Sequence, residues 1–102
     1  MTPFSEEVIK IISLLPKGKV ASYGQIATAA GNPKASRQVS RLLHTCTKKY
    51  NLPWHRVINS SGKISLKGES YYKQVALLES EDVEFNLNGS IDFKRFGFFR
   101  IK

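Results

Sequence analysis

The sequence predicts a mainly α-helical domain with a small β component, organised around a helix-turn-helix. Apolar residues repeat at helical spacing near the N-terminus, and two further amphipathic segments flank the short turn GNPK. Nearer the C-terminus, apolar residues alternate on both sides of an Asn-Gly pair. A chain of 102 residues is long enough for one modest core. We therefore expect a single domain spanning residues 1–102.

The first helix is predicted from its start and stop signals. Thr2 is a suitable N-cap, Pro3 suits the first helical position, and Glu6 and Glu7 complement the positive helix end. The segment Pro16–Gly18 ends the pattern. Apolar residues between these signals recur at helical spacing: Phe4, Val8, Ile11, Ile12 and Leu15.

A helix-turn-helix is predicted over residues of about 22–46. Ser22 with Gln25 three residues later forms a capping-box pattern, and Gly31 suits the position after a helix end. We expect Asn32 and Pro33 to be the cap and first residue of the next helix. In that helix the inner face is apolar, at Val39, Leu42, Leu43 and Cys46. Its outer face is polar and basic, at Ser36, Arg37, Ser40, Arg41 and His44.

The C-terminal half contains one further helix and a hairpin pattern. The helix is predicted from about Glu69 to Ser80, with Tyr71, Val75 and Leu78 on one stripe. Apolar residues then alternate around Asn88-Gly89, which predicts a hairpin and tail over residues 83–102. The final stretch KRFGFFRIK interleaves aromatic and cationic residues. Both a strip that contacts DNA or a partner and a strand packed on the body fit this stretch.

Charge indicates the class of partner. Sixteen Lys and Arg residues stand against eight Asp and Glu, which gives a formal charge of +8 and a pI near 9.8. No acidic residue occurs between Lys10 and Lys67. A charge run is usually only a solvated surface, but so long a stretch without an acid favours a polyanionic partner such as nucleic acid.

Several other classes of protein are disfavoured. No apolar run has the length of a membrane span, and the first residues lack a signal-peptide pattern. We expect a soluble protein of the cytoplasm, associated with the nucleoid if the source is bacterial. Cys46, His44 and His55 lack the spacing of metal ligands, so neither a metal nor another cofactor is expected. Cys46 is interpreted as a small core residue.

Three motifs carry a resemblance to a known family. ASYGQIA, GNPKASRQVSRLL and PWHRVI together resemble the DNA-binding domain of the O6-alkylguanine-DNA alkyltransferases, over residues of about 4–83. In that family the last motif reads PCHRV, and its cysteine accepts the alkyl group from the damaged base. The resemblance implies a winged helix-turn-helix like the C-terminal domain of these enzymes, with an acceptor-like loop at residues 53–58.

This chain departs from the family at the acceptor position, where it has Trp54. Alkyl transfer needs a thiolate, and an indole has no comparable nucleophile. A tryptophan here is typical of the alkyltransferase-like proteins, a branch that binds alkylated guanine without repairing it. The resemblance therefore implies no enzymatic activity and no catalytic residue. It also implies that the partners are double-stranded DNA containing O6-alkylguanine and nucleotide excision repair proteins, and we expect a monomer.

The resemblance also implies roles for residues on the DNA-binding side. Tyr23 would crowd a phosphate beside the lesion and help rotate the nucleotide out of the duplex. Arg37 would enter the base stack and fill the space that the base leaves, which suits a planar, always charged side chain. The remaining expected contacts lie on the recognition helix, where small residues permit close approach to the minor groove: Ala35, Ser36, Ser40 and Arg41.

The expected lesion pocket surrounds the PWHRVI motif. His55 would have lost its role in activating a thiol and would hold the turn, whereas Arg56 would bind backbone carbonyls in the core. Relatives in the non-enzymatic branch tend to have Arg where this chain has Lys67, so the ranking of lesions stays open. The pocket residues implied by the resemblance are Trp54, Tyr23, His55, Val57, Ile58, Ser60 and Lys67.

Two alternatives fit the sequence less well. An active alkyltransferase would have to use Cys46, which lies eight positions before Trp54 on the inner side of a helix. A winged-helix transcription regulator would explain the charge and the helix-turn-helix. It would leave the PWHRVI motif and the Tyr23–Arg37 pair unexplained.

Overall fold

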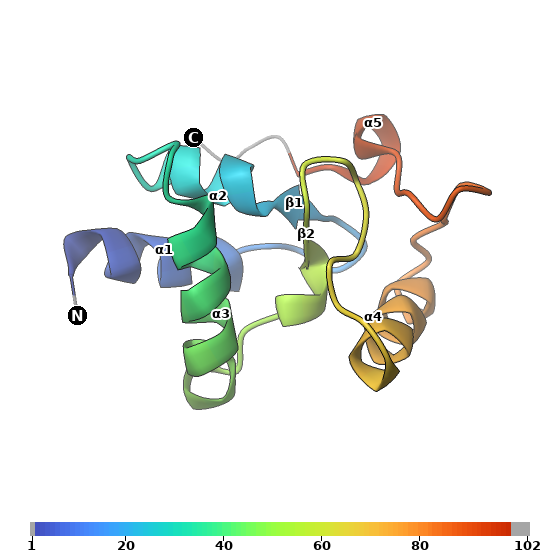
Figure 1. Ribbon diagram of the computed structural model, residues 1–102, viewed down its shortest axis with the longest axis horizontal. Helices are drawn as coiled ribbons and strands as arrows, with labels where there is room; N and C mark the ends of the chain where they lie inside the picture. The colour runs from blue at the N-terminus through green and yellow to red at the C-terminus, as the bar shows by residue number, and fades with distance from the viewer. Residues whose placement is uncertain (1, 99–102) are drawn as a thin grey trace.

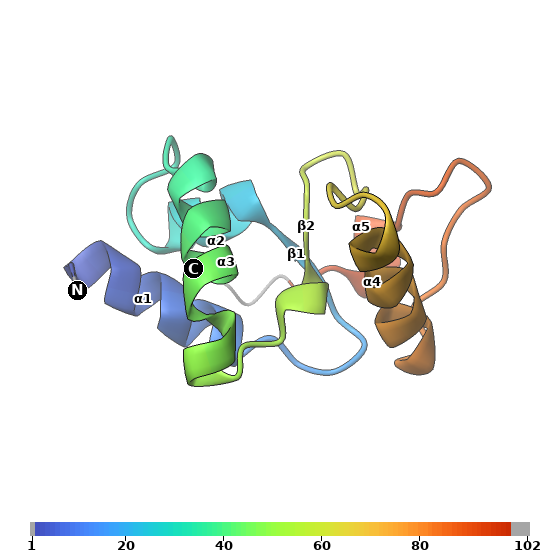
Figure 2. The ribbon, with the colours of Figure 1, turned by 60° about the horizontal axis from the view of Figure 1, so that its bottom comes forward.

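The computed structural model describes residues 2–98 as helices arranged around a two-stranded sheet (Figure 1). The first three helices lie on one side of the sheet and the last two on the other in both ribbon views (Figures 1 and 2). This arrangement confirms the mainly α class with a small β component. The elements are α1 (Pro3–Ser13), β1 (Ala21–Ser22), α2 (Tyr23–Ala29), α3 (Ser36–Tyr50), the 3-10 helix η1 (Trp54–Arg56), β2 (Val57–Ile58), α4 (Glu69–Ser80) and α5 (Phe93–Phe96).

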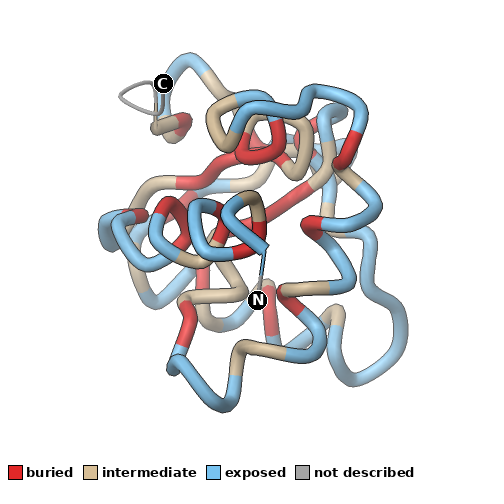
Figure 3. Tube along the Cα trace, turned by 90° about the vertical axis from the view of Figure 1, so that its left-hand side faces the viewer, coloured by how far each residue is buried: buried red, intermediate tan, exposed pale blue. Residues whose placement is uncertain are grey.

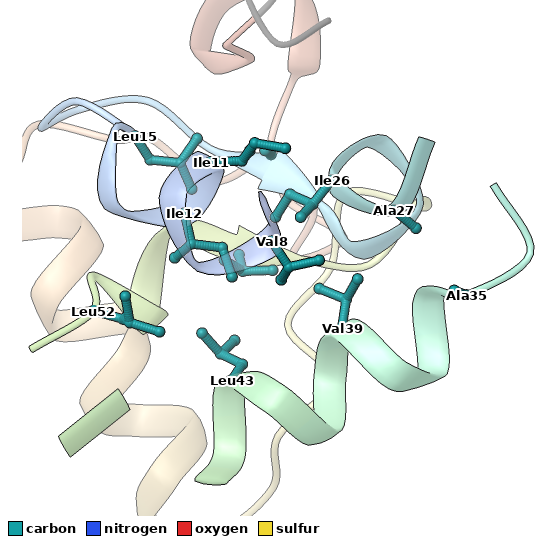
Figure 4. Packing of buried hydrophobic residues seen from close by; sticks show 12 residues of the cluster. Val8, Ile11, Ile12, Leu15, Ile26, Ala27, Ala35, Val39, Leu43 and Leu52 are labelled. Carbon is teal, nitrogen blue, oxygen red and sulfur yellow. The ribbon is translucent and has the colours of Figure 1, made fainter. Parts of the chain in front are cut away.

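Two hydrophobic clusters hold the elements together. In the first, side chains of α1, α2 and α3 converge, and Figure 4 shows Ile12, Ile26 and Val39 pointing toward one another. All three are fully buried. The second cluster lies between the sheet and the C-terminal elements and consists of Val20, Ile58, Leu78, Val83 and Ile91. Figure 3 shows that the buried segments run through the middle of the molecule while the outer turns are exposed.

The sheet brings distant parts of the chain side by side. β1 pairs with β2 in parallel, with Ala21 opposite Val57 and Ser22 opposite Ile58. Because the strands are parallel, the residues that follow them meet at the same edge of the sheet. The start of α2 therefore lies beside the turn that begins at Asn59.

The helix starts predicted for α1, α2 and α4 and the ends predicted for α2 and α4 are confirmed, whereas α1 ends at Ser13, before Leu15. The Thr2 side chain accepts a hydrogen bond from the Ser5 backbone N–H, at 3.1 Å. Ser22 and Gln25 form the complete capping box at the start of α2. α4 begins at Glu69 and ends at Ser80, as predicted.

The predicted start and end of the recognition helix were wrong. Asn32 and Pro33 belong to a turn, in which the Ala35 N–H donates to the Asn32 carbonyl at 3.1 Å. Proline suits the second position of such a turn as well as the first turn of a helix, so the pattern was ambiguous. α3 continues to Tyr50 rather than Cys46, and it ends where Asn51 adopts a left-handed conformation with φ 52°.

The predicted hairpin within residues 83–102 was also wrong. No strand occurs at residues 83–96 of the described chain; α5 begins at Phe93 instead. The turn is present, because the Asn86 N–H donates to the Ser90 carbonyl at 2.7 Å. Leu87 points fully into solvent, so the apolar alternation does not correspond to a buried face.

For the tail, the packed alternative is confirmed in part. Gly97 forms a parallel bridge with Val20, and Phe98 packs against the first hydrophobic cluster. The last four residues of the tail lie outside the described residues.

Candidate nucleic-acid interface

The first turn of α2 places Tyr23 between two other parts of the molecule. Ser22 accepts a hydrogen bond from the Gln25 N–H at 3.0 Å, and the Gln25 side chain accepts one from the Ser22 N–H at 2.8 Å. Burial raises the pKa of the half-buried Tyr23 hydroxyl, while hydrogen bonding with Ser40 and Ser65 opposes the rise. The hydroxyl therefore lies between α3 and the loop of residues 59–68. Ser65 was not expected at the site.

The outer face of α3 is exposed and basic. Arg37, Ser40 and Arg41 are exposed, and Ser36 is half-buried. Ala35 differs from the expectation of a purely surface position, because only 9% of it is accessible and it packs in the first cluster. A larger side chain there would disturb the core as well as obstruct approach to DNA.

An open groove runs along one side of this face. Its volume is about 520 Å³, and its lining consists of Asn32, Lys34, Ala35, Arg37, Gln38, Arg41, Leu42 and Thr45. Three of these residues are cations and none is acidic. We name it the α3 groove. Lys34, Gln38 and Thr45 were not expected at the site; Gln38 and Thr45 form a second stripe of α3, and Lys34 lies in the turn before it.

The cations of the α3 groove are available to a ligand. Within residues 2–98, the ion pairs of the structure join Glu81 to His55 and Arg56, and Glu84 to Arg95. No described acid therefore pairs with Lys34, Arg37 or Arg41. An anionic ligand would meet these charges without first breaking an internal pair.

η1 places Trp54 at the edge of the first cluster. The Trp54 N–H donates to the Leu52 carbonyl at 2.8 Å, which fixes the start of the turn. The indole is half-buried, packs against the cluster and meets the His55 ring edge-on, with 6.1 Å between ring centroids and 83° between planes. The indole is thus positioned by packing on one side and partly accessible on the other.

Glu81 fixes the two residues that follow Trp54. Its carboxylate lies 2.7 Å from His55 Nε2 and accepts hydrogen bonds from Arg56 Nε and Nη2, at 3.0 and 2.7 Å. It also accepts one from the Gly18 N–H at 2.9 Å. We call these four residues the Glu81 clamp. Burial alone raises the pKa of Glu81, but hydrogen bonds from Arg56, Gly18 and His55 outweigh it and lower the pKa to about 2.

The expected structural roles of His55 and Arg56 are supported by these contacts. Arg56 Nη1 donates to the Leu15 carbonyl at 2.9 Å, which is the kind of backbone contact that was expected. Glu81 was not anticipated, because it lies 26 residues from His55 and belongs to no local motif. Gln74 was missed for the same reason. It is buried and donates to the carbonyls of His55 and Val57 at 3.0 and 3.1 Å.

The other residues expected in the lesion pocket fall into two groups, one buried and one exposed. Val57 and Ile58 are 1% and 0% accessible, so they support the turn from the core and expose no wall to an incoming base. Ser60 and Lys67 are exposed in the loop of residues 59–68. This loop starts with a tight turn in which the Asn59 side chain accepts hydrogen bonds from the N–H groups of Ser61 and Lys63.

Residues 2–98 contain no group of three or more His, Cys, Asp or Glu side chains placed to hold a metal ion. Across the same part of the chain, no helix combines the length and apolar character needed to cross a bilayer.

A helix-turn-helix with a basic recognition helix, beside a turn that carries the motif PWHRVI, defines a DNA-binding domain. The family model described as the DNA-binding domain of 6-O-methylguanine DNA methyltransferase matches residues 3–83. The chain belongs to this family. The winged helix-turn-helix fold expected from the sequence is thereby confirmed.

The chain is also similar to individual known proteins. The chain is 42% identical to a DNA base-flipping protein of Vibrio parahaemolyticus over 94% of its own length and 96% of that protein. It is 40% identical to alkyltransferase-like protein 1 of Schizosaccharomyces pombe, over 82% and 80% of the two chains. It also resembles the crystal structure of S. pombe Atl1 in complex with damaged DNA containing O6-carboxymethylguanine. That match has a TM-score of 0.81 and 34% identity over 96% of each chain.

Proposed function

We propose that this protein binds O6-alkylguanine in double-stranded DNA, flips the damaged nucleotide out of the helix and transfers no alkyl group. The observation that carries the proposal is Trp54 in PWHRVI, which by resemblance to the motif PCHRV takes the place of the acceptor cysteine, on a turn held by the Glu81 clamp. The relatives named for base flipping and for likeness to alkyltransferases support the same reading.

Binding to DNA would use the exposed face of α3. Its cations have no acidic partner among the described residues, so counterion release from the phosphates would supply much of the affinity. Small residues along the helix would allow close approach to the minor groove. Arg37 projects from this exposed face, where a planar guanidinium can stack between bases in place of an extruded one.

The flipped base would lie between Trp54, Tyr23 and the loop of residues 59–68. The extrusion of a base costs a few kcal/mol of stacking and pairing. A partly exposed indole offers an aromatic face on which the base can stack, and such stacking contributes about 1–3 kcal/mol. Lys67, exposed in the same loop, would approach the base and influence which alkyl groups are preferred.

Transfer would be absent because no thiolate occupies the acceptor position. The Trp54 indole lacks a thiolate's reactivity. Cys46, the one cysteine of the chain, lies on α3 beside Thr45, with 3.6 Å between Sγ and the threonine hydroxyl. It belongs to the helix that carries the DNA-binding face rather than to the turn that would hold the base.

A module that binds a lesion without removing it leaves the repair to other proteins. We therefore include in the proposal that the bound complex, as a monomer on the DNA, flags the lesion for nucleotide excision repair. The support is chemical: the alkyl group stays on the base, and excision of the damaged nucleotide removes it without a reaction at the alkyl group.

Competition with an authentic alkyltransferase tests the proposal. The protein measures 38 × 26 × 21 Å, so in any orientation it covers about six to eleven base pairs at roughly 3.4 Å per pair. A second protein cannot reach the same base. Addition of this protein to an alkyltransferase with limiting O6-methylguanine DNA should slow methyl transfer in proportion to the lesion bound, and less so at high salt.

The decisive control is an undamaged duplex of the same sequence as competitor. It should relieve the inhibition only at much higher concentration than the lesion duplex. Normal methyl transfer at concentrations that saturate the lesion by gel shift would show that the base stays accessible, and the flipping pocket would have to be abandoned.

A further inference from the structure

One buried side chain of α4 holds the backbone of the turn that carries Trp54. Gln74 is 2% accessible, and its Nε2 donates to the carbonyl oxygens of His55 and Val57, at 3.0 and 3.1 Å. These two carbonyls lie on either side of Arg56. A side-chain amide nitrogen has two N–H groups, so Gln74 binds the turn with both of its donors.

The end of η1 requires such a donor. The 3-10 helix ends at Arg56, and the last carbonyls of a helix have no partner within it. A buried carbonyl without a hydrogen bond costs free energy, so conformations that turn it toward another donor compete with the folded one. Gln74 supplies the donor from α4 and thereby fixes one conformation of the turn.

The position of the Trp54 indole depends on the residue that Gln74 holds. The indole meets the His55 ring edge-on, with 83° between the ring planes. Nε2 of the same ring lies 2.7 Å from the Glu81 carboxylate. Glu81 thus fixes the side chain of His55 and Gln74 fixes its carbonyl, so the surface against which the indole rests has little freedom to move.

An indole that is ordered before binding favours a flipped base over a base that stays in the duplex. The ordering of a side chain on binding costs free energy, and a base that stacks on a fixed indole avoids this cost. A base that stays stacked in the duplex does not use Trp54. The order of Trp54 therefore acts on the preference for the lesion rather than on the affinity for DNA in general.

We infer that Gln74 is a positioning residue for lesion recognition, which holds the turn PWHRVI from α4 and so keeps the Trp54 indole ordered for the flipped base. This inference rests on the proposed function, in which the damaged base stacks on Trp54. It gives α4, which contains none of the residues expected at the site, a direct part in distinguishing damaged from undamaged DNA.

Two variants of Gln74 separate hydrogen bonding from packing. Gln74→Met keeps the approximate size of the side chain but has no donor, whereas Gln74→Lys keeps N–H donors. Gel shifts with O6-methylguanine and undamaged duplexes of the same sequence give the lesion preference of each variant. Gln74→Met should lose about fivefold of this preference, the cost of ordering one side chain, while its affinity for the undamaged duplex stays unchanged. Gln74→Lys should keep most of the preference.

Trp54 is the one tryptophan of the chain, so its fluorescence reports the order of the indole directly. In the free protein, time-resolved fluorescence anisotropy should show larger nanosecond motion of the indole in Gln74→Met than in the wild type or Gln74→Lys. The matched control is Ala76→Met, which places the same side chain at an exposed position of α4 and should behave like the wild type in both measurements. Gln74→Asn, which has the amide on a shorter side chain, replaces Gln74→Met if that variant does not fold.

The inference is wrong if Gln74→Met keeps the wild-type lesion preference, loses affinity for both duplexes equally, or leaves the motion of the indole unchanged. It is also wrong if Gln74→Lys loses as much preference as Gln74→Met, because packing rather than hydrogen bonding would then hold the turn. If the wild type binds both duplexes equally, the proposed function itself fails and the part of Gln74 in recognition fails with it. The fluorescence of the free protein would still show whether Gln74 orders the indole.

Discussion

At the scale of single residues, Arg37 gives the sharpest prediction. Arg37→Ala should weaken binding to O6-methylguanine DNA by about 2 kcal/mol, roughly thirtyfold, because the extruded state loses the group that fills the stack. Fluorescence anisotropy on lesion and undamaged duplexes measures this, with the exposed Lys48→Ala as control. The control should weaken both duplexes alike. A wild-type preference for the lesion in Arg37→Ala would refute the stacking role.

Trp54 gives a second residue-scale prediction. Trp54→Cys should accept methyl groups at least about a hundredfold more slowly than an authentic alkyltransferase, since a small misplacement of a nucleophile costs that much. The indole packs against the first cluster, so its removal leaves space in which a small thiol is poorly positioned. Mass spectrometry after timed incubation measures the rate. Rapid stoichiometric transfer would show that only the nucleophile is missing.

Candidate site residues could be singled out from the sequence where a local motif contained them. Tyr23, Arg37 and Trp54 lie in short motifs, whereas Gln74 on α4 and Glu81 just after it contact the PWHRVI turn from far along the chain. Their partners are fixed by how α4 packs, which no local pattern encodes. The α3 groove was missed for a related reason, because its walls come from a turn and a helix together.

At the scale of elements, the Glu81 clamp joins the loop after α1, η1 and the end of α4. The folded-state pKa of Glu81 is about 2, below its ordinary 4.5, so the ionised carboxylate stabilises the fold. That stability is present above pH 4.5 and is lost as the pH falls toward 2. Only 7% of the Glu81 side chain is exposed, so the lowering of its pKa corresponds to about 3 kcal/mol of folding stability at neutral pH.

Glu81→Gln should therefore lower the free energy of unfolding at pH 7 by about 3 kcal/mol, and the difference from wild type should shrink steadily below pH 4.5. Urea unfolding at several pH values measures it. Glu84→Gln is the matched control, because Glu84 pairs with Arg95 at an exposed site and should change little. An equal loss of unfolding free energy in the two variants would mean that the Glu81 clamp stabilises the fold no more than an exposed ion pair does.

Elements were predictable where capping and apolar periodicity agreed. They agree for α1 and α2, and the periodicity alone placed α4. For α3, the turn chemistry of Asn32-Pro33 imitated a helix start and misplaced the boundary. Around Asn88-Gly89, an alternating pattern coincided with a turn but not with strands, because Leu87 has no core to pack against.

At the scale of the whole molecule, the acids that form described ion pairs lie in a different region from the cations of the α3 groove. Both acids that form described ion pairs, Glu81 and Glu84, follow α4, whereas the cations of the α3 groove have no described acidic partner. The basic surface was predictable because it follows from composition along the chain. The α3 groove was not predictable, since it depends on the direction of each side chain around α3.

The central claim is that the protein recognises O6-alkylguanine and leaves it unchanged. One incubation with O6-methylguanine DNA tests it most directly, with the duplex followed by gel shift and the protein by mass spectrometry. We predict preferential retention of the lesion duplex over an undamaged duplex, with no change in the mass of the protein. A gain of one methyl group would show that the protein is an alkyltransferase. Equal binding of both duplexes would show that it binds DNA without distinguishing the lesion.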